Sequence, residues 1–244
     1  MNNAVNILLP IAGNGSRFFE VGYKQPKPLI KIPYENKTIL QKSLESIKSD
    51  NATLIFIVRQ DHVDIFNIDE YLIQNFGKRT KIIISPDRTD GAVCSCLLAE
   101  EYINNENPLI IFTPDCYFEP CFNYLEVDDK YDGAVGVFYS DSEAHSYVTT
   151  TNNGILKQAA EKQVISHHAV GGLYYYKKGS DFVSCSREML GDKKKSKGEY
   201  YICPVFNYMI KNNKKIIVQE QTTHHILGTP RDLETYIKLF KGSQ

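Results

Sequence analysis

The sequence has little of what marks a membrane protein, a secreted protein or a nucleic-acid-binding protein. No apolar run among its 244 residues is long enough to span a bilayer. Its formal net charge is only -1 at pH 7, which argues against a nucleic acid or an anionic membrane surface as the main partner. The N-terminus lacks the basic region and the small-residue cleavage site of a signal peptide. We therefore expect a cytoplasmic protein that has neither nucleic acid nor membrane as a partner.

Common metal-binding and hydrolytic signatures are absent as well. The six cysteines include no repeated Cys-x-x-Cys pair of a structural zinc site, so we expect free thiols. No Gly-x-Ser-x-Gly elbow is present, which leaves nucleophilic hydrolysis without support. There is also no linker, internal repeat or low-complexity tract. The sequence therefore predicts a single domain over residues 1–244.

Short apolar runs alternate with amphipathic stretches, which indicates an α/β fold with a mainly parallel central sheet. In the first half we expect strands over residues 5–9, 52–58, 81–84 and 109–113, and helices over 38–47, 62–76 and 90–102. In the second half we expect strands over 133–138, 145–150, 155–158, 171–176 and 215–219, and helices over 180–190, 198–210 and 230–240.

A loop with two glycines follows the first predicted strand and leads to two cationic residues. Gly13 and Gly15 let the backbone turn and bring N–H groups close to an anion, and Arg17 and Lys27 add positive charge. A dinucleotide-binding loop does not fit, because Phe18 stands where its third glycine is needed. A P-loop needs a Gly-Lys-Ser/Thr ending that is missing here. A triphosphate-binding loop and an ordinary surface turn both stay open at this point.

Asp115 follows the apolar strand LIIF, so it should project from the carboxyl edge of the sheet, where open α/β sheets bind ligands. A carboxylate there can hold a divalent cation against phosphate oxygens, or it can cap a turn. The turn at residues 88–92 follows the third strand and opens a helix. A glycine in this turn, Gly91, permits close approach of a flat base.

Two of these segments together resemble a known family. The sequence GNGSRF at residues 13–18, followed by PKPL at residues 26–29, resembles the signature of the sugar-phosphate nucleotidylyltransferases, the nucleoside-diphosphate-sugar pyrophosphorylases. The resemblance implies a Rossmann-like, three-layer nucleotidyltransferase fold similar to GT-A. It also implies an enzyme that transfers a nucleoside monophosphate from a nucleoside triphosphate to a phosphorylated small-molecule acceptor, releases pyrophosphate, and uses Mg²⁺ or Mn²⁺. Residues 1–120 then form a nucleotide-binding half and residues 121–244 an acceptor-binding half.

The resemblance also implies roles for individual residues. The catalytic residues are Arg17, Lys27, Asp115 and Lys162, with Asp115 as the metal ligand. The nucleotide-binding residues are Ala12, Gly13, Asn14, Gly15, Ser16, Gly91 and Ala92. The acceptor-binding residues are Glu161, Gly172 and Glu199.

One position departs from the family pattern. Many members carry a second metal-binding aspartate two residues before a Gly-Thr pair, and here Ile226 stands before Gly228. Either His225 supplies a ligand, or the metal depends on Asp115 and the phosphates. Ordinary packing near a strand end is the alternative for His225 and its neighbour His224.

The acceptor is less constrained. The short chain resembles the compact cytidylyltransferases of bacterial capsule pathways, including those that activate L-glutamine phosphate with CTP. A sugar-1-phosphate nucleotidylyltransferase that uses dTTP or UTP and a catalytically inactive nucleotide-binding regulatory module are the alternatives. A glycosyltransferase is disfavoured, because Tyr117 occupies the third place of an Asp-x-Asp motif. The oligomeric state stays open, and a homo-oligomer is among the alternatives.

Overall fold

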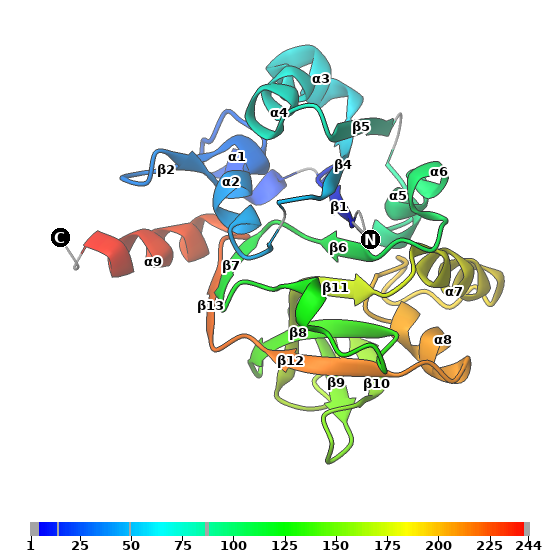
Figure 1. The fold of residues 1–244 in the computed structure, drawn as a ribbon. Coiled ribbons are helices and arrows are strands. Elements are labelled where there is room, and N and C mark those ends of the chain that lie inside the picture. Colours follow the sequence, from blue (N-terminus) through cyan, green and yellow to red (C-terminus); the bar gives the residue numbers. More distant parts are fainter. Residues whose placement is uncertain (1–4, 14, 49, 86–87, 242–244) are drawn as a thin grey trace.

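One nine-stranded sheet organises the computed structural model, which describes residues 5–13, 15–48, 50–85 and 88–241 (Figure 1). The first half of the chain supplies its parallel part, as the continuous apolar runs predict. The central strand β1 pairs in parallel with β4 and β6, and β4 pairs in parallel with β5. These strands are β1 (Asn6–Pro10), β4 (Thr53–Arg59), β5 (Thr80–Ser85) and β6 (Leu109–Phe112).

The second half of the chain extends the same sheet with antiparallel pairs. Strand β11 pairs with β8 along one edge, whereas its other edge pairs with β9 at Ala169 and with β6 at Leu173–Tyr176, so it joins the two halves. Strand β12 pairs in parallel with β8, and β10 pairs with β9. The strands are β8 (Gly133–Tyr139), β9 (Ser146–Thr150), β10 (Leu156–Glu161), β11 (His168–Tyr176) and β12 (Ile216–Glu220).

Helices cover both faces of the sheet and give three layers. Leu8 packs with the cluster that includes Val93, Phe182 and Phe206, whereas its neighbour Leu9 packs with the cluster on the other face that includes Leu40. The helices of the first face are α5 (Ala92–Leu97), α6 (Glu100–Ile103), α7 (Gly179–Gly191) and α8 (Val205–Lys211). Those of the second face include α2 (Ile39–Leu44) and α4 (Ile68–Phe76), with α3 (Gln60–Phe66) beside them.

A third, smaller cluster joins the two ends of the chain. Phe18 and Ile30 pack with Leu233 and Tyr236, so the last helix lies against the segment that carries the glycine loop (Figure 1). The elements around this cluster are α1 (Ser16–Glu20), the 3-10 turn η1 (Lys27–Leu29), β2 (Lys31–Ile32), β3 (Lys37–Thr38) and α9 (Pro230–Lys241). Two further elements are β7 (Cys116–Glu119), paired with β13 (Thr223–Ile226), and the 3-10 turn η2 (Tyr124–Glu126).

The predicted α/β class and its large, mainly parallel central sheet are confirmed, but three predicted helices were wrong in detail. The helix expected over 62–76 is interrupted at Asn67, whose φ of 48° is left-handed. The helix expected over 90–102 is two short helices, α5 and α6. The helix expected over 198–210 begins only at Val205, because Tyr200 forms backbone hydrogen bonds with the turn at Asp90 instead. Among the described residues no helix is both long and apolar enough to cross a membrane.

Candidate active site

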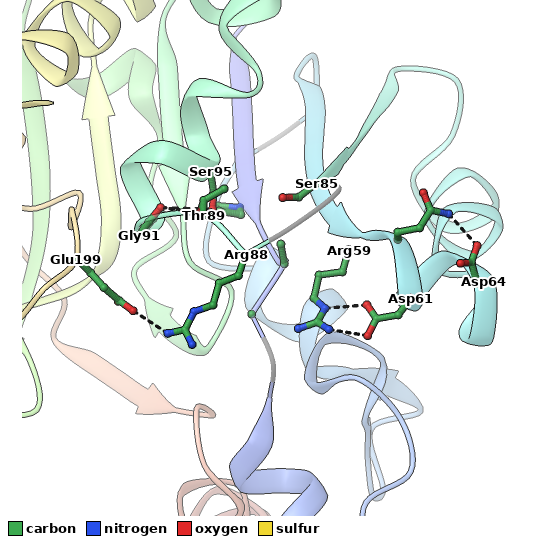
Figure 2. Close-up of a pocket in the computed structure, with 14 residues that line it drawn as sticks. Arg59, Asp61, Asp64, Ser85, Arg88, Thr89, Gly91, Ser95 and Glu199 are labelled. Carbon is green, nitrogen blue, oxygen red and sulfur yellow. Dashed lines mark hydrogen bonds and ion pairs between the residues drawn. The ribbon is translucent and has the colours of Figure 1, made fainter.

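Two adjacent cavities lie at the carboxyl edge of the parallel strands. The larger one, of about 640 Å³, lies where β1, β4 and β5 end, at Pro10, Arg59 and Ser85 (Figure 2). The smaller one, of about 450 Å³, lies between the glycine loop and the end of β6. The two cavities are adjacent and share part of their lining, at Pro10, Gly13 and Arg88. Open α/β sheets bind their ligands at this edge.

The smaller cavity brings together three residues that the sequence predicts to be catalytic. Arg17, Lys27 and Asp115 all line it, although Asp115 lies 88 positions after Lys27 in the chain. The Nζ atom of Lys27 lies 3.4 Å from Oδ2 of Asp115. Both side chains are partly exposed, so this ion pair is accessible to a ligand in the cavity. The ammonium group of Lys27 and the carboxylate of Asp115 therefore lie next to each other in the smaller cavity.

The local fold explains how Arg17 and Lys27 reach the cavity. Gly15 has a left-handed φ of 61° and precedes α1, and its carbonyl accepts a hydrogen bond of 3.0 Å from the amide of Phe18. Phe18 is buried in the third cluster, which leaves the neighbouring Arg17 on the cavity side. Lys27 begins the 3-10 turn η1, whose Pro28 and Leu29 are buried. The buried residues next to Arg17 and Lys27 thus hold the backbone that carries both cationic side chains.

The remaining predicted loop residues lie in the same region. Gly15 and Ser16 line the smaller cavity, Ala12 lines the larger cavity, and Gly13 lines both. Asn14, also predicted to bind nucleotide, lies outside the described residues.

Asp115 stands beside the segment in which the family pattern places a second aspartate. The amide of Leu227 donates a hydrogen bond of 2.7 Å to the carbonyl of Asp115, and Gly228 lines the same cavity as Asp115. The apolar Ile226 is close by, since a Cβ built on Gly228 lies 3.5 Å from Oδ2 of Asp115 and 3.7 Å from Cγ2 of Ile226. Within the described part of the chain, no group of three or more histidine, cysteine, aspartate or glutamate residues is placed to hold a metal ion.

The two histidines before Ile226 point to different surroundings. His225 stacks on Tyr117, with 2° between the ring planes, and meets Tyr236 edge-on, so the geometry gives no support to His225 as a metal ligand. His224 stacks on Phe138 at 3.9 Å between ring centroids. Burial lowers the pKa of His224 to about 4, although the nearby charge of Asp115 opposes this shift. His224 is therefore a neutral imidazole near Asp115 at neutral pH.

The turn after β5 forms one wall of the larger cavity. Gly91 and Ala92, predicted to bind nucleotide, both line it. The φ of Gly91 is 125°, and a Cβ there would lie 2.5 Å from the backbone nitrogen of Tyr200. The hydroxyl groups of Thr89 and Ser95 are hydrogen-bonded to each other at 2.6 Å. The glycine is thus required by the approach of Tyr200, a reason that the sequence alone did not give.

The residues predicted for the acceptor lie on the second half of the chain. Nζ of Lys162 donates a hydrogen bond of 2.7 Å to the hydroxyl of Tyr201, which raises the pKa of Lys162. Glu161 is hydrogen-bonded to the hydroxyl of Ser146, and burial raises the pKa of its carboxyl. The residues that line the two cavities do not include Lys162, Glu161 or the predicted Gly172.

Gly172 lies in a bulge in the middle of β11, the strand that joins the halves. The register of β11 against β8 shifts between Val170 and Tyr174, and the φ of Gly172 is 76°. A Cβ on Gly172 would lie 2.5 Å from Oγ1 of Thr113, a residue that lines the smaller cavity. The absence of a side chain at this position therefore lets the middle of β11 approach Thr113, directly after β6 and two positions before Asp115.

Glu199 and two arginines were not expected where they lie. Glu199, predicted to bind the acceptor, lines the larger cavity and accepts a hydrogen bond of 2.9 Å from Nη2 of Arg88 (Figure 2). Arg59 lies across the cavity, where its guanidinium donates hydrogen bonds of 2.7 and 2.6 Å to the two carboxylate oxygens of Asp61. Each arginine lies close to the carboxyl end of a strand, Arg59 as the last residue of β4 and Arg88 three positions after β5, and this placement was the available signal.

Comparison with known proteins identifies one family. The family model described as nucleotidyl transferase matches residues 6–233. No curated protein sequence matches the chain. Similar solved structures include a nucleoside-diphosphate-sugar pyrophosphorylase from Vibrio cholerae, with 24% identity and a TM-score of 0.81, covering 95% of this chain and 99% of that chain.

Two further structures are similar along their whole length. A putative glucose-1-phosphate thymidylyltransferase from Bacillus anthracis has 20% identity and a TM-score of 0.78, and the match covers 97% of this chain and 95% of that chain. An inositol-1-phosphate CTP transferase from T. maritima has 15% identity and a TM-score of 0.74, and the match covers 98% of this chain and 96% of that chain. At these identities the likeness shows the fold.

Proposed function

The chain belongs to the nucleotidyl transferase family, and from that premise we propose that this nucleotidyltransferase joins the nucleoside monophosphate of CTP to a phosphorylated small-molecule acceptor and releases pyrophosphate. One observation carries the proposal: Arg17, Lys27 and Asp115, from two distant segments, line one cavity beside the larger cavity at Gly91. The inactive regulatory module is disfavoured, because a protein that only binds nucleotide would not need all three of these charged side chains together in one cavity.

The chemistry asks for position and charge rather than for a covalent intermediate. An oxygen of the acceptor phosphate attacks the α-phosphorus of the triphosphate, and the bond from that phosphorus to the pyrophosphate oxygen breaks. Arg17 and the loop amides would bind the β- and γ-phosphates. Lys27 would stabilise the charge on the α-phosphoryl group, since its ammonium group faces the same cavity.

A divalent cation fits beside Asp115. The carboxylate is partly exposed in a cavity that Arg17, Lys27 and Arg88 also line. Carboxylate oxygens are the ligands that Mg²⁺ and Mn²⁺ prefer. When bound, such an ion neutralises charge on the triphosphate. Since Ile226 lies where a second carboxylate could stand, we propose that Asp115 and the phosphates hold the ion, without His225.

We propose that the acceptor lies against the second half of the chain, residues 121–244, with its phosphate on Lys162. Glu161, Gly172 and Glu199 would border it. The resemblance to capsule-pathway cytidylyltransferases supports CTP as the donor and L-glutamine phosphate, for capsular polysaccharide modification, as the acceptor. A sugar 1-phosphate with dTTP or UTP is the second candidate, which the sugar-phosphate enzymes among the similar folds favour.

Pyrophosphate release tests the proposal. Each of ATP, CTP, GTP, UTP and dTTP is mixed with Mg²⁺ and, in turn, with L-glutamine phosphate, glucose 1-phosphate, inositol 1-phosphate and choline phosphate. We expect release with CTP and L-glutamine phosphate, and loss of that release in the Arg17→Ala variant. Release with dTTP or UTP and glucose 1-phosphate would replace the acceptor assignment, and no release with any pair would contradict the proposed reaction.

A further inference from the structure

Arg88 is a cationic side chain that the two cavities share. It follows β5 and lines the smaller cavity together with Arg17 and Lys27, and the larger cavity together with Gly91. Its guanidinium is turned toward Glu199, with 2.9 Å between Nη2 and Oε1 (Figure 2). The two residues are 111 positions apart, so this ion pair connects the two halves of the chain at the cleft.

Backbone contacts fix the segment that carries Glu199. The amide of Tyr200 donates a hydrogen bond of 2.9 Å to the carbonyl of Asp90, and the amide of Val93 donates one of 3.1 Å to the carbonyl of Tyr200. Nζ of Lys195 lies 2.9 Å from Oδ2 of Asp90. Because the backbone directly after Glu199 is held against the turn, the carboxylate of Glu199 can change partners by side-chain rotation alone.

The ion pair is weak enough to be exchanged. The side chain of Arg88 is 77% exposed and that of Glu199 is 36% exposed. Exposed ion pairs of this kind shift an equilibrium by no more than about fivefold. Hydrogen bonds from a guanidinium to phosphate oxygens are stronger, and they can be bidentate. A triphosphate in the smaller cavity therefore outcompetes the carboxylate for Arg88.

Glu199 also lies close to the acceptor side, because Nζ of Lys162 donates a hydrogen bond of 2.7 Å to the hydroxyl of Tyr201, two residues after Glu199. The hydrogen bond to Tyr201 is the main reason for the raised pKa of Lys162, and the charges of Glu161 and Glu199 add to it. The pair Arg59–Asp61 in the same cavity offers no such link, because its partners are two residues apart.

We propose that Arg88 exchanges Glu199 for the phosphate oxygens of the bound nucleoside triphosphate, and that the released Glu199 carboxylate then binds the acceptor beside Lys162. The inference rests on the proposed function. In this exchange no covalent bond forms or breaks, and neither Arg88 nor Glu199 changes its charge. Nucleotide binding thereby becomes a condition for a complete acceptor site.

The experiment measures binding of CTP, with Mg²⁺ and without acceptor, by isothermal titration calorimetry. We expect Glu199→Gln to tighten CTP binding about twofold to fivefold, because Arg88 no longer has to leave a carboxylate. Arg88→Gln should weaken it about tenfold. In the double variant the gain from Glu199→Gln should disappear, and this non-additivity would not follow from a merely structural ion pair.

A matched control uses another exposed arginine–glutamate pair. Nη2 of Arg187 lies 2.8 Å from both carboxylate oxygens of Glu100, and neither residue lines the two cavities. Glu100→Gln should leave CTP affinity unchanged. With a reactive acceptor, Glu199→Gln should lower kcat/KM for that acceptor about tenfold despite the tighter nucleotide.

The outcomes separate the two proposals. If CTP binds and Glu199→Gln leaves its affinity unchanged or weakens it, the exchange is wrong while the proposed function stands. If none of the five triphosphates binds, the proposed function is wrong and the exchange with it. Thermal unfolding of every variant shows whether it is folded, and Arg88→Lys, which keeps the charge, should recover part of the affinity lost in Arg88→Gln.

Discussion

The smaller and the larger cavity share one edge of the sheet but differ in charge. Among the described residues, the charged side chains that line the smaller cavity are three cations, Arg17, Lys27 and Arg88, and one carboxylate, Asp115. Those described in the larger cavity are two cations, Arg59 and Arg88, and three carboxylates, Asp61, Asp64 and Glu199. The smaller cavity is thus suited to a polyanion, and the larger one to an uncharged base and ribose.

The cavities also differ in how their walls are held. Buried apolar residues on either side of Arg17 and Lys27 hold the smaller cavity, whereas the larger cavity depends on the contact between Gly91 and Tyr200. A change in the smaller cavity should therefore act mainly on turnover and ion binding, and a change at the Gly91 wall of the larger cavity mainly on stability. Three substitutions test this division, and a fourth concerns His224, which is not among the residues that line the two cavities.

The largest effect is expected for Asp115→Asn, which removes the carboxylate of the smaller cavity. The loss should cost about 2.7–4 kcal/mol of transition-state stabilisation, or roughly a hundredfold to a thousandfold in turnover. Pyrophosphate release under saturating substrates measures it. Asp128→Asn, at an exposed ion pair with Lys130 outside both cavities, is the control and should keep normal turnover. Normal turnover in Asp115→Asn would end the comparison, because the smaller cavity would then not be the reaction site.

The neutral imidazole of His224 should make stability fall in acid. Its pKa is lowered from 6.5 to about 4, so the folded state resists protonation. The contribution is fully present above pH 6.5 and is lost as the pH falls toward 4, at most about 3 kcal/mol. Urea unfolding at pH 7, 5.5 and 4.5 measures it. His224→Phe, which keeps the stacking on Phe138, should make the slope between pH 7 and 4.5 shallower by the share of His224, whereas His167→Gln at an exposed site should not.

Gly91→Ala tests the wall of the larger cavity. The residue needs a φ of 125°, and its new Cβ would lie 2.5 Å from the nitrogen of Tyr200, so we expect a loss of about 1–3 kcal/mol in unfolding free energy. Thermal or urea unfolding measures it. Gly191→Ala has nothing within 4 Å of its new Cβ and should change stability by no more than about 0.5 kcal/mol. Equal effects of the two substitutions would show that the contact with Tyr200 does not hold this wall.

The same comparison shows what could be predicted from the sequence. The glycine loop and Asp115 follow strands with continuous apolar runs, and the edge of a parallel sheet brings such residues together. Local pattern was enough for these two, since each lies next to its own strand, whereas Lys27 lies 17 positions after β1 and was predicted from its charge and its place in the sequence PKPL. The α/β fold and its three layers follow from the same runs.

The larger cavity could not be predicted in this way, because long-range contacts build it. The ion pair of Arg88 with Glu199 joins residues 111 positions apart. Tyr200 lies within the segment 198–210 that local periodicity assigned to a helix, yet its backbone bonds to Asp90 and the helix begins only at Val205. The pairing of β7 with β13, which places Ile226 near Asp115, is likewise absent from any local pattern.

The smallest effect is expected for Ile226→Asp, which adds a carboxylate to the smaller cavity and so reduces the difference in charge between the two cavities. A second carboxylate near Asp115 should tighten Mn²⁺ binding about tenfold in the absence of nucleotide, because affinity for such ions rises with the number of charged oxygen ligands. Electron paramagnetic resonance of free Mn²⁺ measures the affinity. In the Ile226→Asn variant the asparagine has nearly the same shape as aspartate but no charge, so this variant should bind Mn²⁺ as the unchanged protein does. If Ile226→Asp binds Mn²⁺ no better than Ile226→Asn, then residue 226 does not reach the ion at Asp115. The pairing of β13 with β7, rather than the identity of residue 226, would then explain why the metal site has a single carboxylate.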